Sequence, residues 1–230
     1  MIKKILILIS LSGFSCTSDD IIRSQKNNFY DIYRNIIFQE SNSNTTKVKT
    51  VKTLYNREWL SNFNQPIILL SSVDGKKAAT LVALGNYKNT LTWVSVDGIS
   101  VSFENGILIA TRGYSQDLLE SQQSDLNTLF LNPKKDRLKT YRYLNGQNDY
   151  RELSFSCTVK TRINTTSSFL DLTLNTTKFT EACKAGTTTH TNEYYVLPNT
   201  NIVLKSKQWI SETNGYIKIY NYYAFQNNIR

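Results

Sequence analysis

The chain has 230 residues, of which 40% are hydrophobic and 20% charged, and this composition supplies one core and excludes wholesale disorder. The net charge of +9 predicts a basic surface that suits anionic partners such as lipid head groups or acidic polysaccharide, unless the charges are only solvated. The lysines are scattered and no DNA- or RNA-binding motif occurs, so we expect no nucleic-acid partner.

The first sixteen residues have the organisation of a bacterial export signal. A positively charged end precedes an apolar core, residues 5–11, that is too short to span a bilayer as a helix. Cys16 follows the core and precedes a polar tether, which predicts a lipoprotein signal over residues 1–16. The residues before Cys16 depart from the usual cleavage box at Gly13 and Phe14. An ordinary secretory signal cut nearby is the alternative.

We predict that residues 17–230 form one β-rich domain. Lipidation of Cys16 would anchor this domain to a membrane in the periplasm. Several acyl chains on one residue give stable membrane attachment, because each buried CH₂ contributes about 0.8 kcal/mol. No Asp directly follows Cys16. By resemblance to bacterial sorting patterns, this favours the periplasmic face of the outer membrane.

Export also changes what the remaining cysteines can do. In an oxidising compartment an isolated pair such as Cys157 and Cys183 can form a disulfide. Closing a loop of this length would add about 3 kcal/mol of stability on the chain-entropy model. Two buried free thiols are the alternative, and the sequence leaves both open.

The mature chain begins with a predicted helix and continues as predicted strands. Apolar residues over 19–39 recur at spacings of three, four and seven, which predicts a helix. Residues 66–121 then contain five apolar runs. The pairs that separate them are strong hairpin-turn signals because tight turns need positive φ: Asp74-Gly75, Gly85-Asn86, Asp97-Gly98 and Asn105-Gly106.

Within this stretch, residues 91–111 predict a three-stranded meander with two-residue turns. Its middle strand, residues 99–104, should place Ile99, Val101 and Phe103 on one face and the polar residues between them on the other. Ser115 is expected to cap a short helical turn, and residues 122–137 are polar and predict an exposed connection.

The rest of the chain alternates in strand fashion up to a final predicted strand over residues 216–225. Strands and helices do not alternate, so we predict no parallel sheet. The expected fold is mainly β: an antiparallel sheet curled into an open barrel or sandwich, with the N-terminal helix.

We predict no catalytic residues, no metal site and no cofactor. The one histidine, His190, lies in a Thr-rich segment and is expected in an exposed loop. No cluster of metal ligands, phosphate-binding loop or nucleophile elbow occurs. Asp97 and Asp117 are candidates only for a distant carboxylate pair. Asp97 has a simpler role in a turn, and Asp117 in the first turn of a short helix.

The order of these features resembles the YjbF/GfcB family, bacterial lipoproteins encoded with exopolysaccharide or group 4 capsule secretion genes. The family pattern has a Trp, an Asp-Gly turn, then Gly, Thr, Gly and Asp-Leu. The matching residues here are Trp93, Asp97, Gly98, Gly106, Thr111, Gly113 and Asp117 with Leu118. Residues 192–210 resemble the family's C-terminal pattern, with Ser206 and Gln208 at its Ser and Gln. The cleavage box and the Asn-Thr-rich residues 164–177 depart from the family.

The resemblance implies a non-catalytic accessory lipoprotein of capsule or exopolysaccharide secretion, anchored to the outer membrane through Cys16. Its expected partners are polysaccharide-secretion proteins and acidic polysaccharide. Two other functions stay open: a periplasmic enzyme acting on glycans through distant carboxylates, and a lipid carrier that holds acyl chains in a half-open barrel.

Overall fold

The computed structural model describes residues 66–75, 77–123, 129–131, 133, 136–144, 149–170 and 172–228. The predicted signal segment, Cys16 and the predicted helix over residues 19–39 lie outside the described residues. Among the described residues, no helix has both the length and the hydrophobicity needed to cross a membrane.

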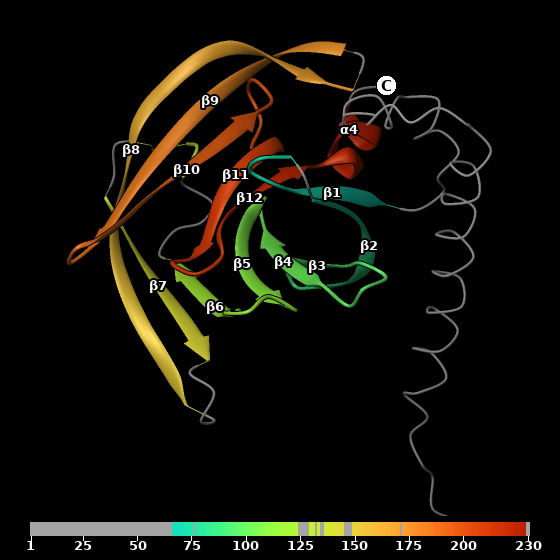
Figure 1. The fold of residues 1–230 in the computed structure, drawn as a ribbon. Coiled ribbons are helices and arrows are strands. Elements are labelled where there is room, and N and C mark those ends of the chain that lie inside the picture. The colour runs from blue at the N-terminus through green and yellow to red at the C-terminus, as the bar shows by residue number, and fades with distance from the viewer. Residues whose placement is uncertain are drawn as a thin grey trace, which may run out of the picture. The chain divides into compact units, whose positions relative to one another are not determined.

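The described chain is mostly β-structure, with twelve strands and one short helix. The elements are β1 (Ile67–Ser72), β2 (Ala78–Tyr87), β3 (Thr90–Val94), β4 (Ser100–Glu104), β5 (Ile107–Arg112), β6 (Leu118–Gln123), β7 (Arg137–Leu144), β8 (Tyr150–Phe169), β9 (Leu172–Ala185), β10 (Thr188–Val196), β11 (Val203–Ser211), β12 (Gly215–Tyr220) and α4 (Tyr222–Asn228). The long hairpin of β8 and β9 arches on one side, and the short strands β1 to β5 curl on the other (Figure 1).

All strands belong to one antiparallel sheet in the order β5-β4-β3-β2-β1-β12-β11-β10-β9-β8-β7-β6. Its two edge strands, β5 and β6, follow each other in the chain and lie close together. They are joined by side chains: the Leu118 N–H donates to Thr111 Oγ1 (2.9 Å), and Arg112 Nη1 donates to the Leu118 carbonyl (3.1 Å). The sheet is therefore a nearly closed barrel, and the predicted mainly β antiparallel fold is confirmed.

Two of the predicted turns form as expected. Asp74-Gly75 lies between β1 and β2, where the Gly75 N–H donates to the Ser72 carbonyl (3.0 Å). Asn105-Gly106 is a two-residue turn between β4 and β5, with φ of 51° and 80°. Positive φ at both residues matches the twist of the flanking strands.

The other two turns differ from the prediction. Gly85-Asn86 lies inside β2, at a bulge against β3, and the turn is made by Lys88 (φ 55°) and Asn89. The loop around Asp97 is one residue longer than predicted, because Ser95 pairs with Ile99 through its N–H (2.8 Å) and also accepts from the Gly98 N–H (3.1 Å).

Three further predictions were wrong. No helical turn follows Ser115; the chain bends and enters β6. Residues 122–137 are not simply an exposed connection, because Leu129, Phe130 and Arg137 are buried. The predicted strand over residues 216–225 stops at Tyr220. There the Asn221 side chain accepts from the Ala224 N–H (3.0 Å) and caps α4.

Alternating residues build the interior, as the period of two predicts. Val101 and Phe103 share one buried face of β4, as expected, whereas Ile99 lies just before the strand and is only partly buried. The main buried cluster draws on nearly every strand: Ile68, Leu70, Leu81, Trp93, Val101, Phe103, Leu108, Leu118, Tyr141, Tyr143, Phe155, Cys157, Cys183, Trp209, Ile210, Ile217 and Ile219. A second cluster around Phe130, Phe179 and Tyr194 lies on the inner faces of β9 and β10.

Candidate functional site

Asp117 organises the connection between the two edge strands. Its Oδ1 accepts from Thr111 Oγ1 (3.0 Å) and the Tyr114 N–H (3.1 Å), and its Oδ2 accepts from the Gly113 N–H (3.0 Å). These bonds replace the helix-start role that the sequence predicted for Asp117. They hold the start of β6 beside the end of β5.

Gln208 holds the other end of β5 from across the interior. Its side chain on β11 accepts from the Leu108 N–H (2.8 Å) and donates to the Gly106 carbonyl (2.8 Å) and to Ser206 Oγ (2.9 Å). Gly106 is required here, because a Cβ at this residue would lie 2.7 Å from Val203. Its φ of 80° also disfavours other residues.

The remaining family-pattern residues pack around the same strands. Trp93 is buried on β3 and meets Tyr223 of α4 edge-on, with ring centroids 5.9 Å apart. Asp97 is exposed in its turn, and a Cβ on Gly113 would lie 3.2 Å from the Ile99 Cα. The pattern residues from Trp93 to Leu118 therefore lie on β3 to β6 or their connections, whereas Ser206 and Gln208 lie on β11.

Asp117→Ala should lower the free energy of unfolding by about 2 kcal/mol, because three hydrogen bonds to a charged acceptor are lost. Asp97→Ala is the matched control and should change it by no more than about 0.5 kcal/mol, as for an exposed turn residue. Urea unfolding followed by fluorescence measures both. Equal effects of the two substitutions would contradict the role given to Asp117.

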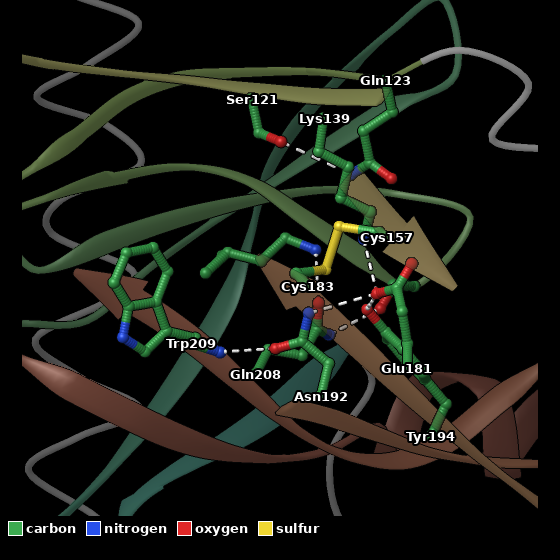
Figure 2. Close-up of polar contacts among 12 residues, drawn as sticks. Ser121, Gln123, Lys139, Cys157, Glu181, Cys183, Asn192, Tyr194, Gln208 and Trp209 are labelled. Atoms are coloured by element: carbon green, nitrogen blue, oxygen red, sulfur yellow. Dashed lines mark hydrogen bonds and ion pairs between the residues drawn. A yellow bond between two sulfur atoms is a disulfide. The ribbon is translucent and has the colours of Figure 1, made fainter. Parts of the chain in front are cut away.

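The interior of the barrel encloses an ion pair between β7 and β9. Lys139 Nζ lies 2.6 Å from Glu181 Oε2, and both side chains are 0% exposed. The same carboxylate oxygen accepts from Asn192 Nδ2 (3.2 Å) and the Tyr194 hydroxyl (3.3 Å), as Figure 2 shows. The Asn192 Oδ1 in turn accepts from the backbone N–H of Trp209 (2.9 Å). The network thus ties four strands together.

The electrostatics of Glu181 reflect two opposing effects. Burial alone would raise the pKa of Glu181, because it disfavours the charged form. The ammonium of Lys139, with hydrogen bonds from Lys139 and Asn192, outweighs burial and holds the pKa of Glu181 below its usual value. Glu181 is therefore a buried anion whose partner is a buried cation.

His190 was predicted to lie in an exposed loop, and this prediction was wrong. It is buried on β10 and stacks on Trp209, with ring centroids 4.3 Å apart and 8° between the planes. Neither ring nitrogen has a hydrogen-bond partner among the described residues. Burial, and then the charge of Lys139, lowers the pKa of His190 to about 4, so the ring is neutral at pH 7. The alternation of His190, Asn192, Tyr194 and Val196 was the available signal.

The two cysteines lie at facing positions of β8 and β9, beside this network. Cys157 and Cys183 are joined by a disulfide with an S–S distance of 2.02 Å. Their sulfurs lie within 4.8 Å of a Glu181 oxygen, a grouping that could suggest a metal centre. Metals bind thiolates, and sulfurs committed to a disulfide cannot supply them. The grouping is therefore structural.

At the α4 end of the barrel, the interior opens into a pocket of about 640 Å³, which we call the mouth pocket. Its floor consists of buried apolar side chains, among them Trp93 and Phe103, and its rim is polar. The rim and wall carry five asparagines, two lysines and a tyrosine: Asn86, Asn89, Asn105, Asn201, Asn221, Lys88, Lys205 and Tyr223. No Asp or Glu of the described chain lines it.

The mouth pocket is a part of the described interior that a ligand can reach. Lys139, Glu181 and His190 are almost completely buried, so they do not meet solvent. Asp117 has both carboxylate oxygens occupied by donors from its own loop and from Thr111. The geometry therefore favours binding at the mouth over acid–base chemistry in the core.

Comparison with known families agrees with the pattern around β3 to β6. Residues 38–221 match the family described as "Group 4 capsule polysaccharide lipoprotein gfcB, YjbF". The chain belongs to this family. This YjbF family member is a capsule polysaccharide lipoprotein at the level of its family. Three residues of the family pattern, Thr111, Asp117 and Gln208, hold β5 against β6 and β11.

Among solved structures, the fold is similar to the crystal structure of the hypothetical lipoprotein YmcC from Escherichia coli K12. The TM-score is 0.61 at 17% identity, over 83% of this chain and 93% of that one. The likeness shows that the YjbF family member and YmcC share a fold. A search of curated proteins found no significant match.

Proposed function

We propose that this protein is a lipid-anchored, non-catalytic accessory of capsule or exopolysaccharide secretion at the periplasmic face of the outer membrane. The observation that carries the proposal is the family match over residues 38–221. The buried, internally paired charges of the core and the open mouth pocket support a binding role. Its partners would be polysaccharide-secretion proteins, acidic polysaccharide, or both.

Deleting the gene tests the proposed function in the cell. Surface polysaccharide should fall in the deletion strain and return when the wild-type gene is supplied on a plasmid. A strain expressing an unrelated lipoprotein from the same plasmid is the control for effects of lipoprotein load. Surface polysaccharide that stays at the wild-type level in the deletion strain would contradict the proposal.

The membrane anchor is a separate prediction. Cys16 should carry acyl chains on the exported protein, because it follows the apolar core of the signal and precedes a polar tether. Cells grown with labelled palmitate should therefore incorporate label into the wild-type protein and none into Cys16→Ser. Label that persists in Cys16→Ser would show that the lipid is attached to another residue.

A lipid carrier is the second candidate, because the floor of the mouth pocket is apolar: Ile68, Trp93, Phe103, Leu204 and Ile219. Native mass spectrometry of the purified protein would detect a co-purified lipid, and its absence would remove this candidate. A glycan-active enzyme would need two carboxylates that face one cleft. The hydrogen bonds that occupy Asp117 give that candidate no support.

A further inference from the structure

The rim of the mouth pocket offers amide groups that the described protein does not use. Asn86 lies near the end of β2, Asn89 lies in the β2–β3 turn, and Asn201 lies just before β11. Their side chains are exposed and make no hydrogen bond within the described chain. Each amide presents two donors and an acceptor on one side chain. A ligand rich in hydroxyl groups can use both kinds of group, since a hydroxyl also donates and accepts.

The charge at the mouth is of one sign. Lys88 and Lys205 line the pocket, and no acidic residue of the described chain does. Lys88 is exposed in the β2–β3 turn, with its Nζ 5.3 Å from the centre of the Tyr87 ring. Low-dielectric walls below a rim of one charge focus the field and attract ligands of the opposite charge. The mouth therefore favours an anionic ligand.

The wall and floor supply flat apolar surface for the same ligand. Tyr223 of α4 is 37% exposed and rests on buried Trp93, which fixes its ring at the pocket wall. The volume of about 640 Å³ lies in the range of small-molecule sites, about 300–1,000 Å³. Aromatic surface beside amides is the combination that serves a ligand with apolar C–H faces and hydroxyl edges.

We propose that the mouth pocket binds a short segment of an anionic polysaccharide, one that carries carboxylate groups on its sugar units. The rim amides would meet hydroxyl groups, Lys88 would meet a carboxylate, and Tyr223 would meet the face of a sugar ring. An acyl chain would fill the apolar floor but leave the rim amides without partners. The inference rests on the proposed role in polysaccharide secretion and adds to it the ligand class and the site.

The test uses the mature chain without acyl groups, produced behind a cleavable secretory signal. The probes are tetrasaccharides of galacturonate and of hyaluronate, with maltotetraose as the neutral comparison and lysophosphatidylglycerol below its micelle concentration as the lipid comparison. Saturation-transfer NMR detects binding, and calorimetry measures affinity. We expect at least one acidic tetrasaccharide to bind and maltotetraose to bind at least about tenfold more weakly, the factor expected for one close charge contact.

Two charge-reversal variants separate a specific site from general attraction. Lys88→Glu should weaken binding of the acidic tetrasaccharide by about tenfold or more. Lys160→Glu is the matched control on β8, because Lys160 is also exposed but does not line the pocket. It changes the net charge equally and should alter affinity less than about twofold. A third variant, Asn86→Ala with Asn201→Ala, should weaken binding without changing the charge.

Three results would overturn the inference: no binding of either acidic tetrasaccharide, equal weakening by Lys88→Glu and Lys160→Glu, or preference for the lipid. Failure of this site differs from failure of the proposed function. If deletion of the gene reduces surface polysaccharide but neither tetrasaccharide binds, the function stands and the site is wrong. If Lys88-dependent binding is found but deletion leaves surface polysaccharide unchanged, the site stands and the function is wrong.

Discussion

Glu181→Gln is expected to lower the free energy of unfolding by about 3–5 kcal/mol, the range measured when one partner of a buried ion pair is removed. The side chain keeps its size, so no cavity forms. What changes is the charge: Lys139 is 0% exposed and would be left as a buried cation facing a neutral amide. Asn192 and Tyr194 would also lose a charged acceptor. Urea unfolding at pH 7 measures the change.

The same substitution on an exposed ion pair is the control. Glu152 accepts from Arg142 Nε at 2.9 Å, but its side chain is 42% exposed. Glu152→Gln should therefore lower the free energy of unfolding by less than about 1 kcal/mol. The double variant Lys139→Met with Glu181→Leu should recover at least about half of the loss, since it removes both buried charges. Equal effects of Glu181→Gln and Glu152→Gln would contradict the importance of burial.

Acidification from pH 7 to pH 4 should lower the free energy of unfolding by about 3 kcal/mol through His190 alone. The pKa of His190 is lowered to about 4 in the folded chain. In the unfolded chain a histidine titrates near 6.5, so it binds a proton there first. The resulting stability is complete above pH 6.5 and is lost as the pH falls toward 4, with about 1.36 kcal/mol for each unit of difference in pKa.

His190→Phe isolates this effect, because His190 is the only histidine in the sequence. The variant keeps an aromatic ring against Trp209 and removes the titration. Its free energy of unfolding should be nearly flat between pH 7 and pH 5, where the wild type declines. Glu181 acts at lower pH: its pKa is lowered in the fold, so its contribution is present above about 4.3 and lost below. A wild type that is equally stable at pH 7 and pH 5 would contradict the neutral, buried His190.

The fold could be predicted wherever local signals and tertiary packing agree. The strict alternation of Val101 and Phe103 with polar residues predicts β4, and Asn105-Gly106 predicts its turn because both residues tolerate positive φ. The same rule failed at Gly85-Asn86. A glycine inside a strand also permits a bulge, and here the bulge lets β2 continue to Tyr87.

Contacts distant in the sequence decide the features that local reasoning missed. An aspartate such as Asp117 is equally compatible with the start of a helix and with a loop. Here the packing of β5 beside β6 decides for the loop, in which Asp117 binds Thr111. His190 is polar and lies among threonines, but the rings of Trp209, Phe155 and Tyr141 pack against it in the interior. β12 ends where Asn221 caps α4. This cap forms only because residues of α4, such as Phe225, are buried against the rest of the fold.

The mouth pocket could not be predicted, because no single motif links its residues, which come from β1, β2, β3, β4, β11, β12, α4 and the turns between them. The family pattern, by contrast, was visible in the sequence as turn and strand residues. The structure adds a physical reason for part of the pattern: Thr111, Asp117 and Gln208 fix the edge strand β5 against β6 and β11. A pattern of this kind identifies the fold. The class of ligand depends instead on the residues that line the mouth pocket.

The role in polysaccharide secretion is tested most directly by where the polysaccharide is found when the gene is deleted. Polysaccharide should be quantified separately on the cell surface, in the medium and inside the cell envelope. We predict that the share outside the cell falls in the deletion strain while the share retained in the envelope rises, and that the wild-type gene reverses both changes. An unchanged distribution between the outside and the envelope would contradict a role in secretion.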